Sequence, residues 1–414
     1  RSKYNRCRQV LNRLVRLDED TSSTSLLADT YSLLGELSRR TGRLPEARSA
    51  GKRAVELAHS SHNCCVESDA YNGLGLAYWV GGMLAEARDC FVKSLKLQEG
   101  NGSMYAEARV ANNLAIIAGD MGDYVEARRL AGKAKEVFIE LGDRRNQAYE
   151  SGNLASLLVG GGHYREAIEL YNSADRIFIK LGETHPHYYT VGNLGDLNLL
   201  LGEFDDADSR YVEVAKFARE SGDQELEAEM CVRFAELAYY RQQRDEARKL
   251  YETAIQKAEA VGSLEFRVRG TIGLCRYLIG ERNAQEAGQA IDRLVKFAQE
   301  SKSDRTRYEA EFLTGEMLRI MGQSASALPH YRECAAYASR QRQFELALKC
   351  YVRLYETNPD SRAETANNLK VLLDDFLSTN GEQIFQRLMN SRYFQFFHET
   401  MMQIAGTTPV GLIR

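Results

Sequence analysis

The chain has 414 residues, of which 44% are hydrophobic and 27% charged, and its formal net charge is −4. This composition is typical of a folded globular chain and excludes a disordered, collagenous or membrane protein. The balance of charge gives no electrostatic basis for direct nucleic-acid binding, which usually shows as a strongly basic domain. No apolar run reaches the ~20 residues that span a bilayer, and no signal peptide is recognisable at the start. The eight cysteines contain no C-x-x-C pair, so we expect a cytoplasmic protein without a metal site, a disulfide framework or a cofactor.

Residues 1–24 begin the chain in the middle of a repeating pattern. Tyr4, Cys7 and Leu11 occupy the positions that Tyr164, Ala167 and Tyr171 hold much later. We therefore predict that this segment is the second helix of a repeat whose first helix is missing, either because the chain is cut from a longer protein or because the helix is an N-terminal cap.

Residues 25–344 contain eight repeats of 40 residues. An alanine marks each repeat, and no insertion interrupts the count: Ala47, Ala87, Ala127, Ala167, Ala207, Ala247, Ala287 and Ala327. Turn glycines keep the same spacing, lapse at Gln242 and Arg282, and return once: Gly42, Gly82, Gly122, Gly162, Gly202 and Gly322. A fixed period between 20 and 50 residues is the signature of a stacked-repeat protein, so we predict one elongated array rather than several domains.

Each repeat has the pattern of two amphipathic helices joined by a tight turn. The first helix carries a large residue followed by a small one, as at Leu74–Gly75 and Leu194–Gly195, and the second carries an aromatic followed three positions later by a mostly small residue, as at Tyr171. Spacings of three and four place these residues on one helix face, which only neighbouring repeats can cover. The turn glycine supplies the left-handed conformation that a tight helix stop requires.

Residues 345–414 depart from the pattern. We predict a ninth, degenerate repeat, followed by two amphipathic helices over residues 363–377 and 383–403 and a loose tail over residues 407–414. The two helices are expected to cap the end of the stack, where apolar surface would otherwise meet water.

These features together resemble the tetratricopeptide repeat over residues 4 to about 357. That family usually has a period of about 34 residues, so the longer period here implies extended helices. The long, asparagine-bearing form resembles kinesin light chains, spindle-orientation scaffolds of the Partner-of-Inscuteable type, bacterial peptide-pheromone receptors and the repeat domain of the maltose-regulon activator. The resemblance implies an all-α fold, a right-handed α-solenoid of stacked helix-turn-helix hairpins, whose repeats bind or regulate and do not catalyse.

The resemblance also implies that the first helices line a concave groove. Carried over by column, the candidate peptide- or protein-binding residues are Asn72, Arg109, Asn112, Asn113, Tyr149, Asn153, Tyr189, Asn193, Asp196, Arg233 and Arg269, with Ser156, Glu236 and Arg276 beside them. Asparagine both donates and accepts hydrogen bonds, so a row of asparagines matches the main chain of an extended peptide. Internal duplication alone would also repeat these letters. We expect no lysine in these columns, so a paired-lysine clamp on a C-terminal carboxylate is not indicated.

No catalytic motif accompanies the repeats. The chain has no G-x-x-x-x-G-K-[ST], H-E-x-x-H or G-x-S-x-G sequence, and the glycines at 160–162 fall at a repeat turn without the Lys-Ser/Thr of a phosphate loop. We therefore expect a protein that is not an enzyme and acts as a peptide- or protein-binding scaffold or adaptor. The alternative is a regulatory or sensor region of a larger signalling protein, such as a kinase, a cyclase or a transcription activator.

Overall fold

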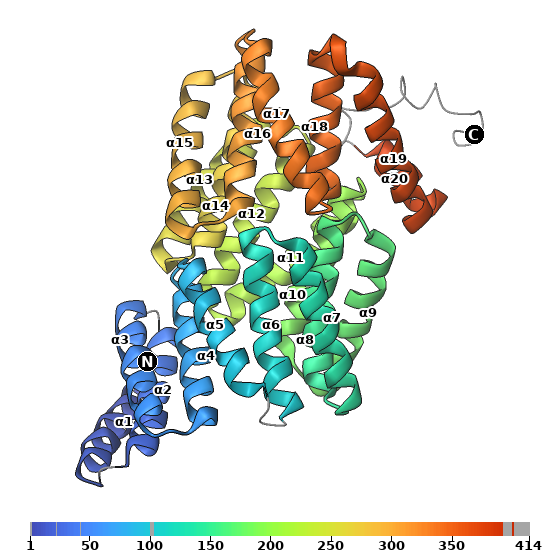
Figure 1. Ribbon diagram of the computed structural model, residues 1–414. Helices are drawn as coiled ribbons and strands as arrows, with labels where there is room; N and C mark the ends of the chain where they lie inside the picture. The colour runs from blue at the N-terminus through green and yellow to red at the C-terminus, as the bar shows by residue number, and fades with distance from the viewer. Residues whose placement is uncertain (1, 22, 42, 100–102, 392–399, 401–414) are drawn as a thin grey trace.

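The computed structural model describes residues 2–21, 23–41, 43–99, 103–391 and 400, and these residues form helices and turns without a β-strand. The first helices of the repeats are α2 (Thr24–Arg40), α4 (Cys64–Val80), α6 (Met104–Met121), α8 (Arg144–Gly160), α10 (Thr184–Leu200), α12 (Gln224–Tyr240), α14 (Leu264–Gly280), α16 (Asp304–Ile320) and α18 (Phe344–Thr357). The second helices are α1 (Ser2–Thr21), α3 (Leu44–Ser60), α5 (Leu84–Gln98), α7 (Tyr124–Glu140), α9 (Tyr164–Leu181), α11 (Phe204–Ser221), α13 (Arg244–Val261), α15 (Ala284–Ser301) and α17 (Ser324–Arg340). Consecutive helices pack against each other throughout, which confirms the predicted all-α solenoid (Figure 1).

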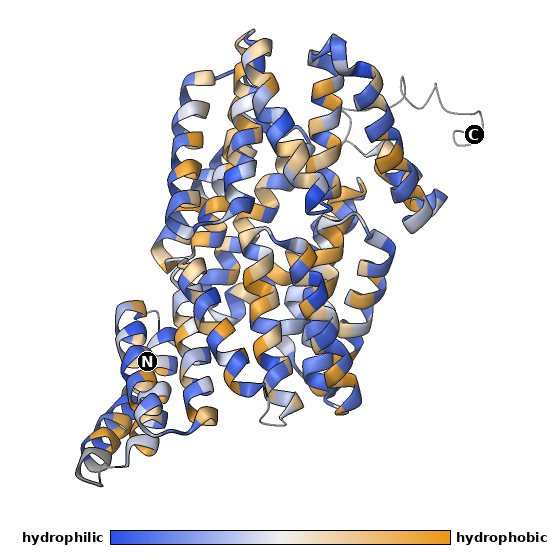
Figure 2. Cartoon of the chain, viewed as in Figure 1, coloured by the Kyte–Doolittle hydropathy of each residue, from blue (hydrophilic) through white to orange (hydrophobic). Residues whose placement is uncertain are grey.

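Buried small residues hold the two helices of each repeat together. All eight alanines of the 40-residue series are fully buried, and the hydrophobic positions alternate with polar ones along each helix (Figure 2). In the first helices, a Cβ added at Gly75 would lie 2.7 Å from the ring of Phe91, and one at Gly195 would lie 2.6 Å from the ring of Tyr211. The small residue therefore makes room for the aromatic of the second helix, because a protein interior tolerates little added volume.

The helix ends follow the turn residues. The side chains of Asp123, Asp143 and Asp223 accept hydrogen bonds from backbone N–H groups of the helices that they precede, which satisfies donors that a helix N-terminus leaves free. Glycines such as Gly122 and Gly222 end the preceding helices in the left-handed conformation.

The solenoid turns tightly enough to touch itself. The first turn (α4 to α11) lies below the second turn (α14 to α19) in Figure 1, and the two meet along a seam. At this seam the Ser303 hydroxyl donates to the Asp120 carbonyl at 2.7 Å, 183 positions earlier in the chain, and the Tyr337 hydroxyl donates to the Gly122 carbonyl at 2.9 Å. The N-terminus of α16 thus contacts the C-terminus of α6. The helix dipoles favour this end-to-end arrangement, because the positive end of one helix meets the negative end of the other.

The C-terminal helices cover more than the end of the stack. After a short 3-10 turn (Pro359–Ser361) come α19 (Arg362–Asn380) and α20 (Glu382–Asn390). Phe376 of α19 packs on Phe344 of α18, with ring centroids 4.4 Å apart, and on Tyr164 of the first turn at 5.4 Å. The pair therefore caps α18, as predicted, and also closes the seam. The predicted helix over residues 383–403 falls partly outside the described residues, and the predicted tail over residues 407–414 falls wholly outside them.

Candidate ligand-binding face

The predicted binding residues all lie on the first helices, from α4 to α14, and the structure gathers most of them into two groups. The first group is an asparagine ladder, in which Asn113 donates to Asn72 at 2.8 Å and Asn153 donates to Asn112 at 2.9 Å. Each bond joins the first helices of neighbouring repeats. Asn72 is buried, whereas Asn112, Asn113 and Asn153 are partly exposed. Asn72 therefore supports Asn113, while the other three keep amide surface at the helix face.

The second group is a charged cluster around Arg233. Its guanidinium group donates to both carboxylate oxygens of Asp196, at 2.9 and 3.1 Å, and to Asn193 at 2.8 Å. Glu229 lies 3.0 Å away, and Arg269 lies 3.6 Å from Glu229. Arg233 is fully buried, so it can act on a ligand only by positioning Asp196 and Asn193.

Ion pairing keeps Arg233 charged despite its burial. Burial disfavours the charged guanidinium of Arg233, but Asp196 and Glu229 outweigh it and raise the pKa of Arg233. Burial also raises the pKa of Glu229, against the opposing effect of Arg233 and Arg269. Pairing offsets part of the cost of burying these groups.

The remaining predicted residues stand apart from both groups. Arg109 forms an ion pair with Asp69 of the preceding repeat and is partly exposed. Tyr149 packs edge-to-face on Phe178, with centroids 5.1 Å apart, and burial raises the pKa of Tyr189, so its hydroxyl stays protonated.

The Asp196 arrangement recurs 120 residues later, a spacing that sequence reasoning did not identify. The Tyr211 hydroxyl donates to Asp196 at 2.7 Å, and the Tyr331 hydroxyl donates to Glu316 at 2.7 Å. Arg353 binds Glu316 with two bonds, at 2.8 and 3.1 Å, as Arg233 binds Asp196. A tyrosine of the second helix and an arginine of the next repeat therefore hold the same acidic column in both halves of the solenoid.

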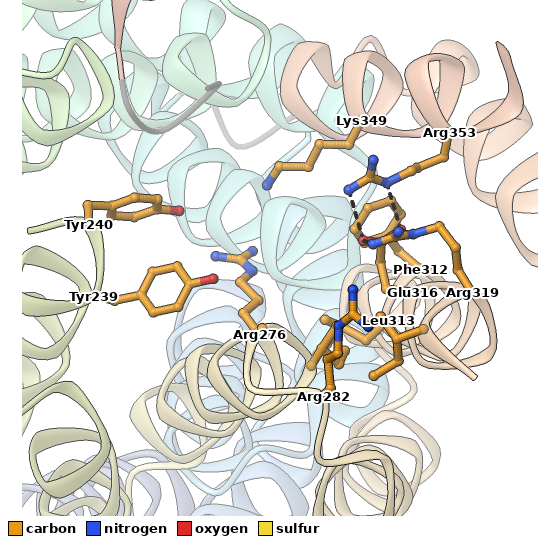
Figure 3. Close-up of a pocket in the computed structure, with 13 residues that line it drawn as sticks. Tyr239, Tyr240, Arg276, Arg282, Phe312, Leu313, Glu316, Arg319, Lys349 and Arg353 are labelled. Carbon is orange, nitrogen blue, oxygen red and sulfur yellow. Dashed lines mark hydrogen bonds and ion pairs between the residues drawn. The ribbon is translucent and has the colours of Figure 1, made fainter. Parts of the chain in front are cut away.

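A cavity of about 370 Å³ lies beside this second arrangement. Side chains of α12, α14, α16 and α18 line it (Figure 3). The lining residues are Tyr239, Tyr240, Arg276, Ile279, Gly280, Arg282, Phe312, Leu313, Glu316, Arg319, Ile320, Lys349 and Arg353. The volume falls in the range of ligand pockets, and nearly all of the lining comes from the first helices, so the cavity belongs to the same face as the asparagine ladder.

Sequence reasoning named only Arg276 among these lining residues as a candidate site residue. The signal for Lys349 was present, because it continues the column of Arg109 and Arg269 into the ninth unit. The expectation that no lysine occupies these columns is therefore wrong in the ninth unit. In the part of the chain that the structure describes, no group of three or more His, Cys, Asp or Glu is placed to hold a metal ion, and no helix has the length and apolar character to cross a membrane.

The fold defines a helical-repeat solenoid, and comparison with known proteins gives the kind of repeat for part of the chain. A tetratricopeptide-repeat family model matches residues 26–100 and 106–180. The chain is thus an α-solenoid in which residues 26–100 and 106–180 match the tetratricopeptide repeat. A search of curated proteins found no match.

Several solved structures share the fold at low sequence identity. NprR in complex with its cognate peptide NprX matches with a TM-score of 0.62 and 11% identity, over 87% of this chain and 99% of that one. The Rap conjugation gene regulator of plasmid pLS20, in complex with the Phr* peptide, matches with a TM-score of 0.57 and 14% identity, over 69% and 77% of the two chains. Aspartyl phosphate phosphatase F from Bacillus subtilis matches with a TM-score of 0.55 and 14% identity, over 69% and 74%.

Proposed function

We propose that the chain is a scaffold that binds an extended peptide or protein segment along the face of its first helices. The observation that carries this proposal is the placement of partly exposed amides and a cavity of about 370 Å³ on that one face. Two similarly folded proteins were solved with bound peptides, NprX and Phr*, which supports a peptide as the ligand.

The chemistry of the asparagine ladder suits a main-chain ligand. Each side-chain amide has two N–H donors and a carbonyl acceptor, and the bonds between asparagines use one of each. A peptide can bond to the remaining donors and acceptors, or can replace a bond between two asparagines with an equivalent one at little net cost. Asn113, Asn153 and Asn193 are the residues that we expect to contact the peptide backbone.

A display library of random peptides tests the proposal. Peptides selected on the wild-type chain are expected to bind about tenfold or more weakly to a variant with Asn113→Ala, Asn153→Ala and Asn193→Ala, because each substitution removes one or more hydrogen bonds. Asn172→Ala is the matched control, since Asn172 is exposed on the second helix α9. Unchanged affinity in the triple variant, with an unchanged helical circular dichroism spectrum, would contradict the proposal.

A regulatory or sensor role is the second candidate. The support for it is the seam between the two turns, because a peptide bound on the first-helix face of both turns would change how they meet. Small-angle scattering of the chain with and without a selected peptide distinguishes the two. A changed radius of gyration indicates a regulator, and an unchanged one indicates a passive scaffold.

A further inference from the structure

The cavity differs in charge from the chain as a whole. Its lining holds four arginines and one lysine but a single carboxylate, that of Glu316, whereas the whole chain is formally at −4. Arg319 and Arg353 share that carboxylate, with Arg319 at 3.1 Å and Arg353 at 2.8 Å. The surface that a ligand would meet in this cavity is therefore cationic.

The other carboxylates that balance these cations lie outside the lining. Glu309 is 3.6 Å from Arg276, Glu356 is 2.7 Å from Arg353, and Glu345 pairs with Lys349. None of the three lines the cavity. These ion pairs fix Arg276, Arg353 and Lys349 at the cavity wall without adding a second carboxylate to the lining.

The ion pairs also fix the protonation states. Burial works against ionisation of Glu316, but Arg353 and Arg319 outweigh it and lower the pKa of its carboxyl group. Glu316 is therefore a carboxylate near neutral pH and orients two guanidinium groups at once. Guanidinium groups held in this way bind carboxylate and phosphate oxygens with little further loss of conformational freedom.

Apolar and aromatic side chains complete the cavity. Phe312, Leu313, Ile279 and Ile320 supply apolar wall. Tyr239 approaches Arg276 from the opposite side of the cavity, its hydroxyl pointing toward the cationic groups (Figure 3). Burial raises the pKa of Tyr239, which keeps this hydroxyl a hydrogen-bond donor. A group that fits must therefore accept several hydrogen bonds and carry an apolar neighbour.

We propose that this cavity receives an acidic group of the bound ligand, a carboxylate or a phosphate, together with the apolar residue or ring next to it. The inference rests on the proposed peptide-binding function and names the chemistry that selects the peptide. A segment held along the asparagine ladder by its backbone gains its specificity from this acidic anchor, because backbone contacts alone do not distinguish sequences.

Small fluorinated probes test the cavity without a known peptide. Fluorine NMR of the full chain is recorded with fluorophenylpropionate, with its neutral amide, and with fluorophenyl phosphate. We expect the two acids to bind and the amide to bind about tenfold or more weakly, because only the acids pair with the guanidinium groups. The ratio of carboxylate to phosphate affinity shows which oxyanion the cavity prefers.

Two variants assign the binding to the cavity. Arg319→Gln removes one cation and leaves Glu316 paired with Arg353, so we expect acid binding to weaken about fivefold to tenfold. Gly280→Leu fills the space without changing charge, since a Cβ at Gly280 would meet only the Tyr239 hydroxyl, at 3.5 Å. Arg332→Gln is the matched control, because Arg332 is exposed on α17 and does not line the cavity.

The outcomes separate this inference from the proposed function. Equal binding of the amide and the acids, or acid binding that survives both variants, would overturn the acidic anchor. If acids bind but no library peptide does, the peptide-binding function fails while the oxyanion site stands. Where peptides are selected, replacing Glu with Gln, replacing Asp with Asn, or amidating the C-terminus identifies which carboxylate enters the cavity.

Discussion

The two turns of the solenoid connect their paired helices with the same left-handed link, but different residues occupy that link. In the first turn, Gly82 and Gly162 sit at the seam, where an added Cβ would lie 2.5 Å from Leu264 and 2.7 Å from Phe344. Gln242, between α12 and α13, and Arg282, in the second turn, adopt the same left-handed conformation, at φ 63° and 56°. Backbone conformation alone therefore does not require glycine here. Contact with the second turn requires glycine at Gly82 and Gly162, because it leaves no room there for a side chain.

Buried carboxyl groups show a second difference between the turns. Glu150 of the first turn is 1% exposed, and one of its oxygens has no hydrogen-bond partner among the described residues. Burial raises its pKa to about 8. Glu316 of the second turn is also buried, but two arginines lower its pKa. The first turn thus buries a neutral acid at some cost, and the second turn uses its acid to orient cations at the proposed binding cavity.

Among the substitutions that test this comparison, Glu150→Gln should change the free energy of unfolding most, through its pH dependence. The folded-state pKa of about 8 lies above the ordinary value of 4.5, so the folded state holds the extra proton between these values. Stability from this group is therefore greatest at low pH and falls as pH rises toward 8. Relative to Glu150→Gln, we expect the wild type to lose about 3 kcal/mol between about pH 5.5 and 8.5 in urea unfolding. Parallel pH profiles for the two proteins would show that Glu150 is solvated.

Gly162→Ala should destabilise far more than Gly322→Ala. Both glycines have a positive φ, 77° and 78°, but only the Gly162 methyl would meet Phe344, while nothing lies within 4 Å at Gly322. We expect losses of about 2–3 kcal/mol and about 1 kcal/mol in the free energy of unfolding. Equal losses would mean that the seam does not restrict the turn.

Asn380→Ala should loosen the seam itself. Its buried side-chain amide donates to the Gly162 carbonyl at 2.7 Å, and its oxygen accepts from the Arg165 N–H at 3.0 Å. We expect a loss of about 1–2 kcal/mol, with faster hydrogen exchange at the start of α9. Ser378→Ala, at an exposed site on the same helix, is the control. Unchanged exchange at Arg165 would exclude this contact as a fastening of the two turns.

Gln242→Gly should have the smallest effect, with the opposite sign. Gln242 is exposed and left-handed, so glycine removes backbone strain, partly offset by the greater freedom of the unfolded chain. We expect a gain of about 0.5 kcal/mol, measured as a shift of the urea midpoint. A loss would indicate that the glutamine side chain contributes contacts that its exposure does not suggest.

The repeat architecture was predictable because it depends on contacts between residues that are close in the sequence. The alanines at 40-residue spacing predicted the helix contacts, and all eight are fully buried. Asn113, Asn153 and Asn193 lie on first helices, as their shared column predicts, but their partners were not predictable. An asparagine that faces a ligand and one that bonds to the next asparagine leave the same letter in the sequence. The binding role of these residues remains our proposal.

By itself, the sequence determined the kind of unit, its length and the order of its helices, because spacings of three, four and 40 residues reflect contacts close along the chain. Only the tertiary structure decided that the second turn lands on the first, and that Tyr239, Arg319 and Lys349 surround one cavity. The physical reason is accumulation: a small rotation between neighbouring repeats, set by side-chain packing, adds up over several units. The accumulated rotation determines which distant residues meet, and it cannot be deduced from the sequence of any single repeat.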